Sequence, residues 1–429
     1  MRFTKVPIIG TNVNLTARAP FTRRACSRDL MPRLATMSRL RLLTAIAFAL
    51  TALAAGNASA RVPQGFVGVD LGVPVYPTTP PGADLANQLD LMVASGVETI
   101  RVPIDWAAAQ PYRSWSKVPA AQQDQFSDLG GIPTKVAPID QLVGLAAYRG
   151  ITVLPTILNA PSWDAQPFKG GTVDVPKTAG PYAAFVKALV KRYGPNGRFW
   201  LSQPRVVPIR EWQIWNEPNI RAFWPAGGFP VRYLTLLKAA HDAIKSVDPG
   251  AQVVLAGLPN YSWVNLAQIY RVRGARSLFD IVAIHPYTRD PQGVITILRL
   301  IRRTMNASHD GRKPIIADEI SWPSSKGKTI HNLGLDFATT EAGQARNVAQ
   351  EIPLLAQNRA RLGLLGFDYY TWATVEEHNG FAFTFSGLLK IIAGRYIEKP
   401  AFSAFRSAAL ALERCKQKGA VATVCAKPA

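Results

Sequence analysis

Eight short apolar stretches, separated by amphipathic segments, constrain the fold of this chain more than any other feature of its sequence. They are GFVGVDLG (65–72), TIRVPID (99–105), TVLPTIL (152–158), WQIWNEP (212–218), QVVLAGL (252–258), DIVAIHPY (280–287), PIIADEIS (314–321) and LLGFDYYTW (364–372). Strands that alternate with helices pair in parallel, because a parallel pair needs a crossover connection. Near-continuous apolar strands are typical of sheets buried on both faces. The pattern predicts a single (β/α)₈ barrel of the TIM type, with an open doubly wound sheet as the alternative.

The segments between the apolar stretches carry apolar residues at helical spacing. They are residues 83–96, 139–150, 182–194, 231–247 and 294–305. In the last segment, Ile295, Leu298 and Ile301 share one face, and the arginines turn away from it. Three segments end at a glycine, where a left-handed C-cap is expected: Gly96, Gly150 and Gly194.

Residues 1–60 have the composition of a leader. From Met37, two arginines precede an apolar run that ends in Ala58-Ser59-Ala60, which is the order of a secretory signal cleaved after Ala60. The true start of translation is expected at Met31 or Met37. The apolar run is short for a membrane span, and an uncleaved anchor is the alternative. We expect a secreted or cell-envelope-associated protein.

Charge and cysteine content narrow the class of partner. The formal net charge of +21 falls to +13 without the nine basic residues and one acidic residue of the leader. No block of basic residues and no nucleic-acid motif stands out, so a nucleic-acid partner is not expected. Cys415 and Cys425 remain after cleavage, and in an oxidising compartment we expect them to form a disulfide in the tail. Two cysteines without a histidine cluster do not predict a zinc site.

Polar and aromatic side chains gather where the predicted strands end. In a (β/α)₈ barrel these C-terminal ends form the active face. The residues are Asp70, Arg101, Asp105, Asn159, Trp163, Asn216, Glu217, His285, Tyr287, Glu319 and Trp372. Each alone has a structural explanation, but together they predict one site at the mouth of the barrel.

Two glutamates, Glu217 and Glu319, end the fourth and seventh apolar stretches. Hydrolysis of a glycosidic bond with retention needs two carboxyl groups roughly 5 Å apart. One must be ionised while the other is protonated, so their surroundings must differ. Arg101 and Tyr287 are expected to keep Glu319 ionised as the nucleophile. Apolar neighbours of Glu217, which are Trp215, Pro218 and Trp224, are expected to favour its protonated form and the acid/base role.

Other residues are expected to bind or support the substrate. Asn216 is placed to hydrogen-bond the sugar hydroxyl next to the reacting carbon. Trp372 is expected to offer a flat face to a pyranose ring. His285, Asn159 and Trp163 are further candidates. The two-carboxylate chemistry needs no cofactor and no metal.

At these residues the chain resembles the clan A retaining glycoside hydrolases, the "4/7" superfamily. The matching motifs are RVP (101–103), WNEPN (215–219), HPY (285–287), DE (318–319), Trp372 and the ending GRYIEKPAFSAFR (394–406). The resemblance spans residues 65–413 and implies that Glu217 is the acid/base and Glu319 the nucleophile. The segment LNAPSW (158–163) lacks the histidine of many family 5 cellulases and is closer to family 39-like sequences.

The sequence therefore predicts a secreted, monomeric retaining β-glycoside hydrolase that acts on oligo- or polysaccharide. The leader is residues 1–60, the catalytic domain residues 61–413 and the tail residues 414–429. A carbohydrate-binding barrel without turnover and a transglycosylase of envelope polysaccharide are the alternatives. Membrane contact is expected only if the signal stays uncleaved.

Overall fold

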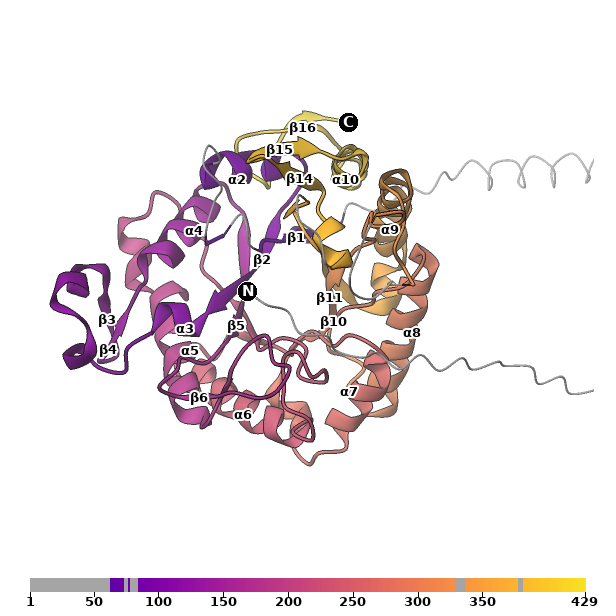
Figure 1. The fold of residues 1–429 in the computed structure, drawn as a ribbon. Helices are drawn as coiled ribbons and strands as arrows, with labels where there is room; N and C mark the ends of the chain where they lie inside the picture. Colours follow the sequence, from indigo (N-terminus) through magenta and orange to yellow (C-terminus); the bar gives the residue numbers. More distant parts are fainter. Residues whose placement is uncertain (1–61, 73–75, 78–83, 329–335, 377–380) are drawn as a thin grey trace, which may run out of the picture. The chain divides into compact units, whose positions relative to one another are not determined.

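Eight parallel strands lie at the centre of the structure, with helices around them (Figure 1). The strands are β1 (Val67–Asp70), β2 (Thr99–Asp105), β5 (Thr152–Leu158), β8 (Glu211–Ile214), β9 (Gln252–Val254), β10 (Val282–Ile284), β11 (Ile315–Ile320) and β12 (Leu364–Tyr369). Their order is β10-β11-β12-β1-β2-β5-β8-β9. Two further parallel bridges, from Val254 to Ile281 and from Leu258 to Ile284, join β9 to β10 and close the ring. The predicted (β/α)₈ barrel is confirmed.

The structure is a computed structural model that describes residues 62–72, 76–77, 84–328, 336–376 and 381–429. The predicted leader lies outside the described residues, which all belong to one compact unit. Within these ranges, no helix has both the length and the apolar character needed to cross a membrane.

The helices that surround the barrel follow the predicted amphipathic segments and add others. They are α2 (Leu85–Ala94), α3 (Trp106–Ala109), α4 (Ala137–Tyr148), α5 (Ala179–Tyr193), α6 (Val231–Lys245), α7 (Ser262–Tyr270), α8 (Pro291–Ala307), α9 (Glu341–Leu362) and α10 (Pro400–Leu412). On α8 the predicted apolar face, Ile295, Leu298 and Ile301, is buried against the barrel. Burial of this face stabilises the helix in place.

The predicted glycine caps are confirmed at two of three positions. Gly96 and Gly150 have φ angles of 86° and 67°, in the left-handed region. The prediction for Gly194 is wrong, because its φ is −71° and its backbone is extended. A side chain is excluded there for another reason: a Cβ atom would lie 2.6 Å from the carbonyl oxygen of Val190.

The loops between the barrel strands and helices contain small sheets and short helical turns. They are the hairpins β3–β4 (Ser127–Leu129, Ile132–Thr134) and β6–β7 (Ala165–Gln166, Val175–Pro176), the sheet β13–β15 (Ala373–Val375, Leu389–Ile392, Arg395–Glu398), and 3₁₀ turns at Trp115–Lys117, Ala120–Gln125, Arg198–Ser202, Ala275–Leu278 and Ala382–Phe385. The hairpin β3–β4 lies in the long loop after β2, to one side of the barrel (Figure 1).

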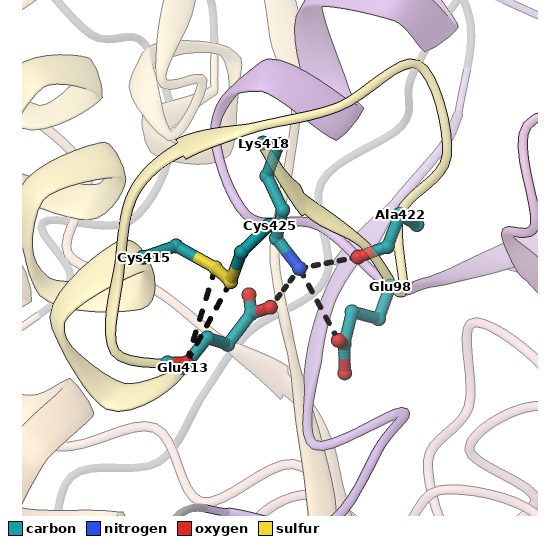
Figure 2. The surroundings of a disulfide bond; sticks show 6 residues. All are labelled: Glu98, Glu413, Cys415, Lys418, Ala422 and Cys425. Atoms are coloured by element: carbon teal, nitrogen blue, oxygen red, sulfur yellow. Dashed lines mark hydrogen bonds and ion pairs between the residues drawn. A yellow bond between two sulfur atoms is a disulfide. The ribbon is translucent and has the colours of Figure 1, made fainter. Parts of the chain in front are cut away.

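The C-terminal tail forms a hairpin, β16 (Cys415–Lys418) and β17 (Cys425–Pro428). A disulfide joins Cys415 to Cys425, with their Cα atoms 5.5 Å apart. Inside the hairpin, the buried ammonium group of Lys418 contacts the Glu413 carboxylate and the Ala422 carbonyl, and lies 3.4 Å from Glu98 Oε1 (Figure 2). Glu98 immediately precedes β2, so the tail docks at the end of the barrel opposite its mouth.

Candidate active site

Arg101, near the middle of β2, contacts more residues of the predicted site than its neighbours on the strand do. Its Nη1 donates to Asp70 Oδ2 (2.5 Å) and to Glu319 Oε1 (2.8 Å), and its Nη2 donates to Asn216 Oδ1 (2.7 Å). Asp70 is the last residue of β1, Asn216 follows β8, and Glu319 lies near the end of β11. One guanidinium therefore binds side chains from the mouth ends of three other strands. The side chain is buried, where charge-assisted hydrogen bonds of this kind are strongest.

Below these contacts, two further buried polar residues form a floor. Gln213, on β8, accepts a hydrogen bond from Arg101 Nε (2.8 Å) and another from Thr156 Oγ1 (2.6 Å). Its amide Nε2 donates to Asp318 Oδ2 (2.5 Å), which also lies 3.2 Å from Arg101 Nε. Gln213 was not among the candidates from the sequence, and Asp318 appeared there only as part of the DE motif, with no role of its own. Their position could have indicated a role, because a glutamine or an aspartate within an apolar strand is buried and needs a hydrogen-bond partner.

His285 and Tyr287, which follow β10, contact the two glutamates. His285 Nδ1 lies 2.7 Å from Glu217 Oε1 and 3.4 Å from Glu319 Oε2. The Tyr287 hydroxyl donates to Glu319 Oε2 (2.7 Å). One carboxylate oxygen from each glutamate and one nitrogen of His285 all lie within 4.8 Å of one another. The two glutamates expected to act together are therefore adjacent.

The same three atoms have a spacing that a divalent cation accepts. Two contacts oppose a cation at this place. The Arg101 guanidinium is already bound to Glu319, and His285 is already hydrogen-bonded to Glu217. The arrangement is better suited to proton transfer between side chains than to metal binding.

Irregular backbone at the ends of β8 and β11 determines the direction in which the side chains of the site point. After β8, Trp215 and Glu217 have left-handed φ angles of 72° and 44°. The turn directs Asn216 to Arg101 and Glu217 to His285, while the Trp215 indole packs on Tyr182 of α5. The apolar setting expected for Glu217 is thus only partly correct, because its carboxylate faces an imidazole.

On β11, the pairing register with β12 shifts between Ala317 and Ile320. Such a bulge re-aims side chains that would otherwise alternate between the two faces of a strand. As a result, the consecutive residues Asp318 and Glu319 both reach Arg101. Regular alternation would direct only one of them toward the barrel interior.

The electrostatics of Glu319 differ from the expectation. Burial raises the pKa of Glu319 to about 7; His285 and Arg101 oppose this rise, and Glu217 and Asp70 add to it. Arg101 does favour the ionised form, as expected, but it is shared with other carboxylates. The expectation that Arg101 and Tyr287 hold Glu319 ionised is therefore only partly correct in the substrate-free site, because the charges of Arg101 and His285 do not fully offset burial and two acidic neighbours.

Trp372 is not at the mouth. Its side chain is fully buried (0% exposed), its Nε1 donates to Gln88 on α2 (3.0 Å), and its ring packs on Phe402 of α10. The expected sugar-facing role is therefore wrong, since the ring points outward into the helix layer. Tyr370, two residues earlier, lies near the carboxylates instead: burial, then Glu319 and Asp70, raise its pKa.

Asn159 and Trp163 shape the loop after β5. The Asn159 amide donates to Asp105 (3.0 Å), and its oxygen accepts from the Asp174 backbone N–H (3.0 Å). Trp163 Nε1 donates to the Gln110 carbonyl (2.8 Å). Among the described residues, neither side chain has a hydrogen bond to the two glutamates, so their contacts support the loop rather than the reacting groups.

Aromatic side chains cover Tyr287 and Tyr370 on the Glu319 side of the site. Phe337 stacks on Tyr287 with ring centroids 5.4 Å apart and planes at 10°. Phe383 packs edge-on against both tyrosines, at 5.0 Å and 5.7 Å. These phenylalanines come from the loops after β11 and β12, which the sequence analysis did not assign to the site.

Comparison with known proteins finds similarity to glycoside hydrolases. No family model matches the chain. It is 24% identical over 245 residues to a β-xylosidase of Geobacillus stearothermophilus, an alignment that covers 52% of this chain and 44% of that enzyme. The chain thus spans less than half the length of this relative.

Two solved structures have the same fold at low sequence identity. One is a family 39 glycoside hydrolase of Bacteroides cellulosilyticus WH2 (TM-score 0.57, 19% identity, 83% of this chain and 65% of that one). The other is a monomeric β-xylosidase of Caulobacter crescentus CB15 (TM-score 0.53, 21% identity, 81% and 68%). The expected resemblance is confirmed: this chain is similar to family 39 glycoside hydrolases and shares their (β/α)₈ barrel.

Proposed function

We propose that this protein is a retaining β-glycoside hydrolase in which Glu319 is the nucleophile and Glu217 the acid/base. The observation that carries the proposal is the spacing of the two carboxylates, whose nearest oxygens lie within 4.8 Å. Retention needs carboxyl groups about 5–5.5 Å apart, whereas inversion needs about 6.5–9.5 Å to admit a water molecule. The spacing supports a direct attack by one carboxylate.

In the first step, a Glu319 oxygen attacks the anomeric carbon, and the bond from that carbon to the glycosidic oxygen breaks. Glu217 gives its proton to the departing oxygen, and an ester joins the sugar to Glu319. In the second step, the Glu217 carboxylate removes a proton from water, which attacks the same carbon and frees Glu319. The pKa of about 7 for Glu319 gives a nucleophile that ionises near neutral pH.

Neighbouring groups are placed to assist each step. The Tyr287 hydroxyl and Arg101 Nη1 bind one oxygen each of Glu319, which orients it for attack. His285 lies against Glu217, where its ring can stabilise the negative charge left after proton donation. Asn216, held by Arg101, is available to the hydroxyl beside the reacting carbon.

The first substrate to test is an aryl β-xyloside, because two of the similar proteins bear the name β-xylosidase. NMR of the freshly released sugar should show the β-anomer first. Inverted product would contradict the proposal, and a glycosyl transfer product formed with added acceptor sugar would favour the transglycosylase. Binding without turnover would favour a carbohydrate-binding barrel.

Azide separates the two roles. Glu319→Gly should abolish turnover, and azide in the vacated space should then give an α-glycosyl azide from a β-glycoside. Glu217→Ala should still react with substrates that have good leaving groups, and azide should give the β-glycosyl azide through two displacements. Glu398→Ala, which changes an exposed glutamate of β15, is the control and should keep full activity. Opposite azide products would reverse the two roles.

We also propose that the protein is exported and cleaved after Ala60, as the Ala58-Ser59-Ala60 motif suggests. Mass spectrometry of the secreted protein should find Arg61 as its first residue. A cell-retained product that keeps residues 37–60 would favour a membrane anchor instead.

A further inference from the structure

His285 lies between acidic groups on both sides of its ring. Its Nδ1 faces Glu217 and Glu319, and its Nε2 lies 3.5 Å from Asp318 Oδ2. The ring is fully buried, and so is Asp318. The chain after β9 also approaches the ring closely, because a Cβ atom at Gly257 would overlap His285 Nε2. The imidazole therefore has a fixed position with carboxylates at both nitrogens.

Asp318 belongs to none of the roles assigned so far. Among the described residues it has no hydrogen bond or ion pair to Glu217, and besides His285 it contacts Gln213 and Arg101 in the floor of the site. A buried ionised carboxylate is costly unless cations or hydrogen-bond donors satisfy it. Asp318 Oδ1 has no hydrogen-bond partner within the described part of the chain, so the charges of His285 and Arg101 compensate its burial.

We propose that Asp318 is a positioning residue that keeps His285 in its charged form, so that the imidazolium can support Glu217 when this glutamate gives up its proton. As an imidazolium, His285 donates Nδ1–H to Glu217 and directs Nε2–H toward Asp318. The chain Asp318–His285–Glu217 links the floor of the barrel to the proton donor. The kinetic part of this inference rests on the proposed function, and the charge of His285 does not.

The balance of charges around the ring supports the proposal. The groups that contact His285 are Glu217 after β8, Asp318 and Glu319 on β11, and Tyr287 beside it. Asp70 on β1 interacts with its charge, and Arg101 on β2 binds the neighbouring Glu319. Burial alone would lower the pKa of His285, but Glu319 and Asp318 raise it to about 10. In turn, burial would raise the pKa of Asp318, but His285 and Arg101 hold it below its ordinary value.

The test is a pH titration of the His285 ring nitrogens by ¹⁵N NMR, with the ring assigned among the five histidines of the chain by triple-resonance spectra. In the wild-type protein both nitrogens should stay protonated at pH 8. A neutral ring at pH 8 in the wild type would overturn the proposal without any variant. In Asp318→Asn the titration midpoint should fall by about one to three pH units, because an opposite charge at this distance shifts a pKa by that much.

The kinetic test compares two leaving groups. For a poor leaving group, which needs the proton of Glu217, kcat/KM of Asp318→Asn should fall about 10- to 100-fold, which corresponds to about one to two pKa units of lost charge stabilisation. For a dinitrophenyl leaving group, which needs no proton, kcat/KM should change little. Equal losses for both substrates would place Asp318 in support of Glu319 and overturn the proposal.

Asp368→Asn is the matched control. Asp368, on β12, is also a buried aspartate of the barrel, but burial, then Asp318, raise its pKa well above the ordinary range, and it has no ion pair with His285 among the described residues. Replacing it by an amide should leave the His285 titration and the leaving-group dependence unchanged. The same changes in both variants would mean that the effect is not specific to Asp318. If the wild-type protein cleaves no glycoside, the function fails while the NMR titration still decides the charge of His285.

Discussion

Replacing Arg101 by methionine removes the cation that Glu319 shares with Asp70 and Asp318. Arg101 Nη1 makes a 2.8 Å charge-assisted hydrogen bond to Glu319 Oε1. A bond of this kind contributes about 1.5–3 kcal/mol, and one pKa unit corresponds to about 1.4 kcal/mol. The pKa of Glu319, already raised to about 7, should therefore rise by a further one to two units, at roughly 1.4 kcal/mol each.

The assay is the pH dependence of kcat/KM for an aryl glycoside with a good leaving group. If Glu319 must be ionised, activity falls as the pH drops below its pKa, so the acidic limb should move from near pH 7 to about pH 8–9. At pH 6 the variant should lose about 10- to 100-fold more activity than at high pH. An acidic limb within half a unit of the wild type, with only KM changed, would refute the reasoning.

The same substitution should also destabilise the fold. Three buried carboxylates lose their common partner, and breaking a buried ion pair costs roughly 3–5 kcal/mol. Thermal unfolding measures this loss, and the kinetics are then recorded at a temperature at which the variant is still folded. Arg149→Met is the control, because Arg149 pairs with Asp90 (2.7 Å) away from the site and should leave the acidic limb unchanged.

Other parts of the structure give further expected outcomes. Gly257→Ala should displace the His285 ring, which should lower the free energy of unfolding by about 1–3 kcal/mol and lower kcat. An unchanged melting temperature and kcat would show that the backbone at Gly257 moves to accommodate the methyl group. Cys415→Ser should lower the free energy of unfolding in urea by about 2–3 kcal/mol, because it opens the loop to Cys425 with a separation of 10 residues; a wild-type protein insensitive to reductant would contradict this. The pKa of His285 is raised from 6.5 to about 10 in the fold, so its stabilising contribution is complete below pH 6.5 and lost as the pH rises through 10. The free energy of unfolding should fall over this range and fall less in His285→Gln, and equal slopes would argue against a charged ring.

The barrel and its two glutamates were predictable from sequence, because both depend on local information. Each apolar stretch is long enough to be a buried strand, and the alternation with helices leaves few topologies open. A charged residue at the end of such a stretch is costly to bury, so Glu217 and Glu319 stand out without any structure. Arg101 and Tyr287 were predictable as partners of Glu319 for the same reason.

The direction in which each side chain points was decided only by the tertiary structure. The shift in register on β11 lets Asp318 and Glu319 both reach Arg101, and the left-handed turn after β8 faces Glu217 toward His285. At the end of β12, the ring of Trp372 joins the helix layer. A bulge or a left-handed residue changes which face a side chain takes, and it depends on neighbouring strands rather than on local composition.

Protonation likewise depended on the assembled site. From sequence, one arginine beside Glu319 was expected to keep it ionised. In the fold, Arg101 also binds Asp70 and contacts Asp318, and burial removes water from all of them. The pKa of Glu319 is the balance of these opposing contributions, since each depends on distances of a few ångströms between residues far apart in the chain. The sequence alone determined which residues carry charge at the mouth of the barrel, and the tertiary structure decided how they share it.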